Sequence, residues 1–271
     1  LLHYLFSIYF SRGDWPDQNE CVWRTQDGSR KWKWILWDMD NTVAYYLNPW
    51  YDMFNQAIVG NRGYGPSDIL VALLDNDQFR YDFINSYCDW MNTSFLPTLM
   101  QQRVDSMKAE LAPFMPEYRL RWQTNYNWTN QTDSMKWWVG LRPQYCRQQL
   151  QSRFSLNASV RLGLQVSDTL KGNIHVNTVQ LDGATPRTSA FTFPWAGYYF
   201  PGVPVPLTAI PKPGYRFLHW LPTFDTSRTV IANLTRDTLL TAVFDIDPNY
   251  SPPLRVVINE VMASNTFTIP D

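Results

Sequence analysis

The stretch that decides how the amino-terminal half is interpreted is Gly13-Asp14-Trp15-Pro16-Asp17-Gln18-Asn19, followed later by Trp32-Lys33-Trp34-Ile35-Leu36-Trp37-Asp38-Met39-Asp40. The first segment is a Gly- and Pro-containing loop that combines an acid with an amide five residues later. In the second segment, large apolar side chains alternate between two faces, which predicts a strand covered on both sides. Asp38 at its end would then be partly withdrawn from water and would need a cation or several donors. Oxygen-bearing side chains of this kind suit a hard cation such as Mg²⁺.

A simpler interpretation of the loop is a set of turns. Asp14, Asp17 and Asn19 belong to residue types that form turns, because their short side chains hydrogen-bond to nearby backbone. In protein kinases, however, an acid of this kind accepts the proton of the attacking hydroxyl. There, an asparagine five residues on and an acid after the next hairpin hold Mg²⁺. The strand that ends in Asp38 and Asp40 therefore favours a phosphotransfer site over plain turns.

Together the two segments resemble the CotH (spore-coat) kinase family, whose members are secreted or surface-attached relatives of protein kinases. The resemblance covers about residues 1–154. The features that carry it are, in chain order, Gly13-Asp14-Trp15-Pro16-Asp17-Gln18-Asn19, Trp23-Arg24, Trp37-Asp38-Met39-Asp40, Asn76-Asp77-Gln78-Phe79-Arg80 and Arg142-Pro143.

The resemblance implies a role for each acid and for the amide. Asp14 would be the catalytic acid, Asn19 and Asp38 would bind Mg²⁺, and Asp40 would be the second, supporting acid of the metal site. Mg²⁺ and ATP are the implied cofactors. Family members commonly continue to a glycine shortly after the acids, whereas Asn41-Thr42-Val43-Ala44 contains none. This difference predicts restricted backbone freedom in the metal loop.

Composition limits the class of protein. Hydrophobic residues make up 45% of the 271 residues, which is enough for a buried core. The 23 Lys and Arg nearly balance the 24 Asp and Glu, which argues against nucleic acid as a partner. No apolar run is long enough to predict a membrane span. The three cysteines fit neither a zinc spacing nor a disulfide framework, so we expect buried free thiols, with one disulfide as the alternative.

The predicted fold class is α+β and multidomain: a mainly helical, kinase-like carboxy-terminal lobe followed by a small β-sandwich. Residues 66–154 show helical periodicity, and Met100, Val104, Met107 and Leu111 share one expected apolar face. The expected starts and breaks are Ser67 as a cap, Asp75 or Asn76 as the next cap, Ser94 with Pro97 as a start, Pro113 and Pro116 as breaks, Asn125–Asp133 as a polar stretch before the last helix, and Pro143 as a kink or a start.

From about Leu156 the periodicity changes to two, with short runs separated by Gly and Pro, which is typical of a β-sandwich. The alternating sets are Val160, Leu162 with Leu164, Ile174 with Val176, and Leu239, Thr241 with Val243; Tyr215, Phe217 and Trp220 are the expected aromatic core. Gly172–Asn177, Gly197–Gly202, Pro213–Trp220 and Leu240–Phe244 resemble the B-repeats of internalin-type bacterial surface proteins.

We expect a kinase-like lobe at 1–155, the β-repeat at 156–247, a linker at 248–253 and, at 254–271, the first strand of a lamin-tail-like domain. That last part is suggested by the resemblance of Val256–Asn265. Because apolar residues begin at position 1, we also expect the chain to be part of a longer protein.

Two functions remain open. The first is the carboxy-terminal portion of a secreted or cell-surface bacterial CotH-like kinase that transfers phosphate from Mg²⁺–ATP to an unidentified protein acceptor in the full-length protein. The chain alone is expected to be inactive, since the covering loop and the phosphate-binding lysine of a kinase belong to an amino-terminal lobe. The second is a catalytically dead scaffold whose β domain contacts a cell surface or glycans.

Overall fold

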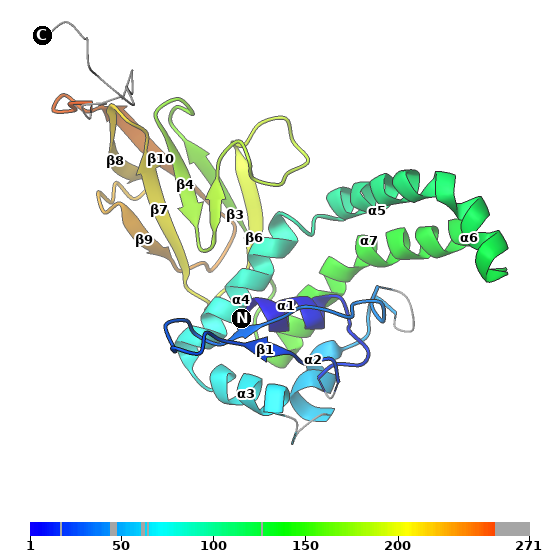
Figure 1. Cartoon of the computed structure of the whole chain (residues 1–271). Helices are drawn as coiled ribbons and strands as arrows, with labels where there is room; N and C mark the ends of the chain where they lie inside the picture. The colour runs from blue at the N-terminus through cyan, green and yellow to red at the C-terminus, as the bar shows by residue number, and fades with distance from the viewer. Residues whose placement is uncertain (17, 44–47, 61–62, 64, 126, 253–271) are drawn as a thin grey trace, which may run out of the picture.

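A computed structural model describes residues 1–16, 18–43, 48–60, 63, 65–125 and 127–252. Within these residues, helices are followed by a β-sandwich, which confirms the predicted α+β class (Figure 1). The helical elements are α1 (Leu2–Tyr9), α2 (Met53–Asn55) with a π-helical turn (Gln56–Gly60), α3 (Gly65–Leu74), α4 (Asp77–Asn92), α5 (Pro97–Leu111), a 3₁₀ turn (Ala112–Phe114), α6 (Met115–Trp122) and α7 (Trp128–Arg153).

Helix starts follow the local sequence at some positions and not at others. Asn76 caps α4 as predicted, because its side chain accepts a hydrogen bond from the Phe79 backbone N–H at 2.9 Å. Pro97 occupies the first turn of α5, where a missing N–H costs nothing. The prediction for Ser67 was wrong, since α3 already begins at Gly65 and Ser67 lies within its first turn.

The helical arm matches the expectation in part. Helix α5 ends at Leu111, two residues before Pro113, which agrees with the predicted break; Pro113 and Pro116 then lie in the first turns of the next two short helical elements, where proline is tolerated. The polar stretch contributes to a helix rather than only preceding it, because Asn127 caps α7 and α7 begins at Trp128. Pro143 lies inside that helix.

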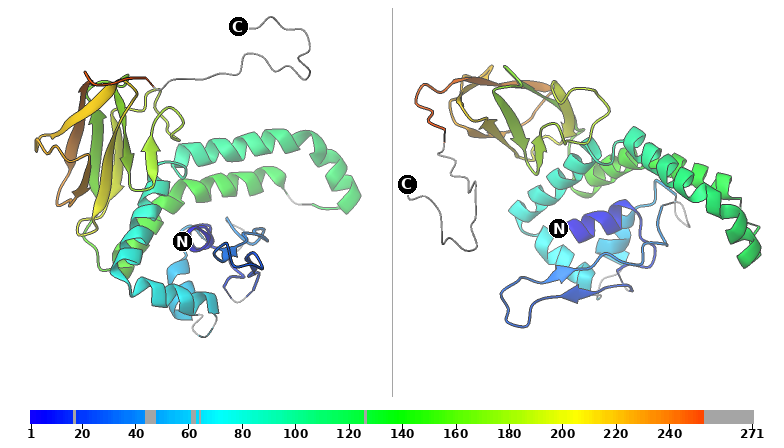
Figure 2. Two further views of the ribbon diagram at one scale, coloured as in Figure 1. Left: turned by 60° about the vertical axis from the view of Figure 1, so that its left-hand side comes forward. Right: turned by 45° about the horizontal axis from the view of Figure 1, so that its top comes forward.

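Helices α5 and α7 run side by side and project away from the rest of the molecule, with α6 at the tip (Figures 1 and 2). Lys136 of α7 pairs with Asp105 of α5 at 2.9 Å. The predicted apolar face of α5 is covered only as far as the middle of the helix: Met100 is half-buried and Val104 buried, whereas Met107 is 63% and Leu111 49% exposed. Toward its end, this face therefore lies beyond the core.

The helical core encloses α1, whose Tyr4, Leu5, Ile8 and Tyr9 are buried. Arg142 of α7 is also fully buried and fixes the end of α1 through backbone carbonyls. Its four hydrogen bonds are Nε to Tyr9 O at 2.6 Å, Nη2 to Ile8 O at 2.8 Å, and Nη1 to Pro49 O at 2.7 Å and Tyr51 O at 2.9 Å.

Two four-stranded sheets form the sandwich in the described part of the chain, with orders β6-β3-β10-β8 and β5-β4-β7-β9. Strand β3 pairs in parallel with β10; the other neighbours in these two sheets are antiparallel. The strands are β3 (Val160–Val166), β4 (Gly172–Val176), β5 (Val179–Leu181), β6 (Trp195–Tyr199), β7 (Val205–Pro211), β8 (Tyr215–Leu221), β9 (Thr229–Ala232) and β10 (Thr238–Ile246).

The alternation predicted the buried face of the early strands and missed that of the last. Leu162 and Leu164, like Ile174 and Val176, are buried as expected, and Val160 of the first set is half-buried. In β10 the inward residues are Leu240, Ala242 and Phe244, and Leu239 of the predicted set is 53% exposed. Leu239 is followed by Leu240, which points to the opposite face of the strand. Because both residues are leucine, polarity could not show which of the two faces the core. Of the expected aromatic core, Trp220 is buried, Phe217 packs against the core, and Tyr215 is half-buried.

A buried carboxylate joins the helices to the sandwich. Asp89 of α4 accepts hydrogen bonds from the Tyr199 hydroxyl at 2.7 Å, from Asn177 Nδ2 at 2.6 Å, and from the hydroxyl and backbone N–H of Thr178 at 2.6 and 3.1 Å. Burial raises the pKa of Asp89 even though these donors favour its charged form. Further bonds across the boundary run from Asn85 Nδ2 to Pro204 O at 2.7 Å and from Asn92 Nδ2 to Tyr198 O at 3.1 Å.

After β10 the chain turns back onto the sandwich. The backbone N–H of Asp247 donates to the carbonyl of Gly214 at 3.0 Å, and that of Tyr250 donates to the carbonyl of Asp247 at 3.1 Å. The first residues of the expected linker at 248–253 thus include a turn. The expected lamin-tail strand at 254–271 lies outside the described residues.

Candidate active site

The loop after α1 brings the two predicted residues Asp14 and Asn19 into direct contact. Asn19 Nδ2 donates to Asp14 Oδ2 at 2.8 Å, and both residues are half-buried. The other carboxylate oxygen, Asp14 Oδ1, is buried and has no partner among the described residues. The hydrogen bond orients the carboxylate and leaves one of its oxygens able to accept a proton or a hydrogen bond. Asp17 lies outside the described residues.

Arg12 connects this loop to the acidic segment. It is fully buried, and its Nη2 donates to the carbonyl of Asn19 and to the carbonyl of Trp37, each at 2.8 Å. Asn19 is itself a proposed metal ligand, and Trp37 directly precedes the second one, Asp38. One guanidinium nitrogen therefore holds the backbone at both places. Burial lowers the pKa of Arg12, while Glu20, Asp14 and Asp38 oppose that shift. Sequence reasoning gave Arg12 no role in the site.

Two backbone hydrogen bonds fix the segment that follows the acids. The N–H of Gly13 donates to the carbonyl of Asn41 at 3.0 Å, and the N–H of Val43 donates to the carbonyl of Phe10 at 3.2 Å. A Cβ at Gly13 would lie 3.0 Å from the Asn41 side chain, so this close approach favours glycine.

Packing beneath the loop restricts its movement. The Trp15 side chain is fully buried, and its indole N–H donates to Glu20, which also contacts His3 Nε2 at 3.0 Å. Gln56 of the π-helical turn donates to the carbonyl of Trp15 at 3.1 Å. Residues from distant parts of the chain therefore position the loop that carries Asp14.

Asp38 and Asp40 interact with each other. The pKa of Asp38 is raised, chiefly by a hydrogen bond with Asp40, with further contributions from slight desolvation and from the negative charges of Asp40 and Asp14. Carboxylates that repel one another share a proton or attract a cation. Asn19 and Asp38 also adopt left-handed backbone conformations, with φ of 58° and 54°, which Asn and Asp tolerate better than most residues.

The predicted environment of Asp38 was wrong. Only Lys33–Trp34 (β2) forms a strand, paired with Val22–Trp23 (β1), and Trp32 and Trp37 are 54% and 48% exposed. Asp38 is itself exposed. Alternating aromatic residues indicated an extended segment but could not show whether other elements cover it. The hydrogen bond with Asp40 is the largest cause of the raised pKa of Asp38, ahead of desolvation.

A family model described as CotH kinase protein matches residues 1–146, which is more than half of the chain and includes every proposed site residue. The chain belongs to the CotH kinase family. A second model, the divergent InlB B-repeat domain, matches residues 177–248. The matched range begins after β3 and β4 have ended. Both strands nevertheless belong to the sandwich, and β3 is an inner strand of its first sheet. No curated protein and no solved structure is significantly similar to the chain.

The glycine that CotH kinases commonly carry after the acids is replaced by a segment in which Val43 has a φ of 44°. A β-branched residue rarely adopts this left-handed conformation, because its side chain crowds the backbone. The segment after the acids therefore carries backbone strain at Val43, whose side chain is half-buried against the core.

The residues present suit a magnesium ion that also binds substrate phosphates. Among the described residues, no three His, Cys, Asp or Glu side chains form a ready-made metal cage. Mg²⁺ does not need such a cage, because it usually takes one or two carboxylates and completes its shell with water and phosphate oxygens. The hydrogen bond between Asp38 and Asp40 brings two carboxyl groups together, and the negative charge of Asp14 adds to the raised pKa of Asp38, so this pair favours a cation.

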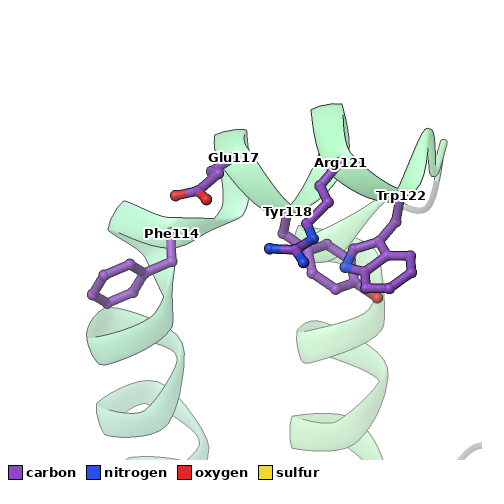
Figure 3. A pocket seen from close by; sticks show the side chains of 5 residues that line it. All are labelled: Phe114, Glu117, Tyr118, Arg121 and Trp122. Carbon is purple, nitrogen blue, oxygen red and sulfur yellow. The ribbon is translucent and has the colours of Figure 1, made fainter.

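A separate aromatic surface lies at the tip of the helical arm. A hollow of about 290 Å³ there is lined by Phe114, Glu117, Tyr118, Arg121 and Trp122 (Figure 3). The Arg121 guanidinium lies 5.6 Å from the centre of the Trp122 ring. This surface belongs to α6 and the turn before it, and the loop that carries Asp14 contributes nothing to it. None of the helices in the described part of the chain is both long and apolar enough to cross a membrane.

Proposed function

We propose that this CotH-family chain carries the base and the metal ligands of a protein kinase that transfers phosphate from Mg²⁺–ATP in the full-length protein. The contact between Asn19 and Asp14, held against Trp37 and Asp38 by Arg12, is the observation that supports the proposal most strongly. It unites an acceptor for a proton with oxygen ligands for a cation, and a phosphotransfer site needs both.

In this proposal Asp14 accepts the proton of the acceptor hydroxyl. The hydrogen bond from Asn19 orients this carboxylate, and Asp14 Oδ1 has no donor of its own among the described residues. Asn19 and Asp38 would hold Mg²⁺, with Asp40 supporting Asp38, and the ion would neutralise phosphate charge when bound. The Arg12 guanidinium would offset part of the negative charge that remains on the acids.

We also propose that the protein acts outside the cell or on the cell surface of a bacterium, because its sandwich resembles a repeat of bacterial surface proteins. The division into a kinase-like lobe at 1–155 and a β-repeat at 156–247 remains part of the proposal. The scaffold hypothesis would require the same fold with an inert site, so binding of Mg²⁺–ATP distinguishes the two.

Thermal unfolding of the full-length protein, with and without Mg²⁺–ATP, tests the site. We expect the nucleotide to raise the melting temperature only when Mg²⁺ is present, and Asp38→Ala to abolish the rise, since only ligands that bind the folded state stabilise it. Asp75→Ala is the matched control, because Asp75 is an exposed aspartate between α3 and α4. If a full-length protein shows no Mg²⁺-dependent shift, or if Asp38→Ala and Asp75→Ala behave alike, the proposed site is wrong.

A further inference from the structure

A cleft of about 790 Å³ lies between α5 and the loop that joins β5 to β6. Its size falls within the range of ligand-binding sites. One wall comes from the helical part of the chain and the other from the sandwich, near the place where α5 begins beside the sheets (Figure 1). On the helical wall, the apolar lining residues are Phe10, Phe95, Leu99 and Met100.

The polar lining of the cleft is cationic. Arg103 extends from α5 and Arg187 from the β5–β6 loop, together with serine, threonine and glutamine side chains, and none of the described lining residues is an acid. Arg103 is exposed and makes no hydrogen bond or ion pair that would neutralise it within the described part of the chain. In a chain of net charge −1, two arginines without a lining carboxylate favour an anionic ligand.

Arg187 is already held in place for such a ligand. Its Nη1 donates to the carbonyls of Gly183 and Thr185, each at 2.9 Å. Its Nε is buried and lacks an acceptor among the described residues. Nη1 thus anchors the guanidinium to its own loop, and no hydrogen bond within the described residues occupies Nη2, which leaves that donor for a carboxylate. Pre-organised arginine side chains lose less entropy when they bind carboxylates in the fork geometry.

The walls of the cleft are fixed relative to each other by the buried carboxylate at the boundary. Asp89 binds Asn177 and Thr178, which connect β4 to β5, and β5 leads directly into the loop that carries Arg187. The opposite wall begins just after α4, the helix that carries Asp89. The cleft therefore has two walls built on one anchored framework.

We propose that this cleft binds an extended acidic peptide segment that has apolar side chains at alternate positions. Successive side chains of an extended peptide point to opposite sides. Carboxylates could then meet Arg187 on one wall while apolar side chains contact Met100 on the other, and Arg103 beside Met100 adds electrostatic attraction for the acidic segment. Phe10 lies four residues before Asp14, so a protein bound in the cleft would be close to the proposed phosphotransfer loop. Binding itself is independent of phosphotransfer.

Fluorescence anisotropy of the full chain with a labelled peptide of alternating Glu and Leu tests the proposal without nucleotide. We expect saturable binding that weakens as NaCl rises from about 0.05 M to about 0.5 M, because salt screens the charges. A peptide with Lys in place of Glu should not bind. Arg103→Glu should weaken binding by about tenfold or more, since it removes an attraction and adds a repulsion. Arg187→Lys keeps the charge but loses the fork, and should weaken binding less.

Arg236→Glu is the matched control. Arg236 is exposed in the loop after β9, and β9 lies at the opposite edge of its sheet from β5. We expect its peptide affinity to stay within about twofold of the parent, since exposed charges beyond a Debye length are screened. The proposal is overturned if the acidic peptide does not bind, if the Lys peptide binds equally well, or if Arg103→Glu and Arg236→Glu have the same effect. Arg103-dependent binding of a sulfated oligosaccharide in place of the peptide would assign the cleft to a glycan instead and overturn the peptide proposal.

Discussion

Arg12 offers the sharpest test of whether the acids form a metal site. Its Nη2 bridges the carbonyls of Asn19 and Trp37 with two hydrogen bonds of 2.8 Å. Lysine at this position keeps the positive charge beside the acids, but its single ammonium group is not expected to reach both carbonyls with the same geometry. A hydrogen bond from a charged donor contributes roughly 1.5–3 kcal/mol. If Arg12→Lys loses one such bond, the ligand-competent arrangement is destabilised by about that amount.

Destabilising the ligand-competent arrangement lowers the apparent affinity for the metal ion. When only a fraction of the molecules is competent to bind, the apparent dissociation constant rises in inverse proportion to that fraction. A cost of about 1.4 kcal/mol corresponds to a tenfold change. We therefore expect Arg12→Lys to weaken Mn²⁺ binding, measured by electron paramagnetic resonance with Mn²⁺ in place of Mg²⁺, by about tenfold or more.

Arg142→Lys is the matched control, because Arg142 is equally buried and also donates to backbone carbonyls. Its partners lie at the end of α1 and before α2, and they include none of the proposed ligands. Arg142→Lys should lower the free energy of unfolding by about 3 kcal/mol or more, since it breaks several charged hydrogen bonds. It should leave Mn²⁺ affinity unchanged at temperatures where the protein is folded. The reasoning is refuted if Arg12→Lys loses stability but keeps the parental Mn²⁺ affinity.

Three further predictions concern strain, thiol reactivity and pH. At Val43, Val43→Gly should be more stable than Val43→Ala by about 1 kcal/mol in denaturant unfolding, because glycine accepts the φ of 44° and alanine does not; the usual order, with alanine more stable, would exclude strain there. Without denaturant, a thiol reagent should modify only Cys21, which is exposed, whereas burial raises the pKa of Cys88 to about 12 and also raises that of Cys146; rapid labelling of either buried thiol in the native protein would contradict this. In the folded state the pKa of Asp89 lies above its ordinary value of 3.8. Between these two pKa values the folded protein therefore binds more protons than the unfolded chain. The contribution of Asp89 to the free energy of unfolding should then fall as pH rises through this window. The free energy of unfolding should be measured against pH for the parent and for Asp89→Asn, and the difference between the two should decline as pH rises. A difference that stays constant or increases would refute the prediction.

Local signals predicted much of the fold. The cap at Asn76, the start at Pro97 and the change from helical to alternating periodicity all depend on residues close together in sequence. The errors occurred where burial depends on distant elements. Trp32 and Trp37 alternate as in a covered strand, yet the structure leaves both exposed, and Cys21 lies exposed on the same hairpin.

The candidate site divides in the same way. Asp14, Asn19, Asp38 and Asp40 could be selected because the sequence preserves their types and spacing. Arg12 could not, since its partners lie 7 and 25 residues away and are backbone carbonyls, which carry no sequence signal. Asp89 had one local clue, an acid between Cys88 and Trp90 on the buried face of a helix, but its partners lie 88 to 110 residues further along the chain.

Asp89 also gives a physical reason for the sandwich to matter to the kinase-like part. A flexibly attached repeat would present Arg187 at many distances from Arg103, and ordering it would cost entropy at each binding event. The hydrogen bonds to Asn177, Thr178 and Tyr199 remove that cost in advance, because they fix the β4–β5 connection against α4. A repeat that served only as a spacer would gain nothing from a buried carboxylate whose ionisation is opposed by desolvation. The free-energy cost of burying Asp89 is therefore better explained if function requires a fixed position of the repeat relative to α5. Binding in the cleft between them would be such a function.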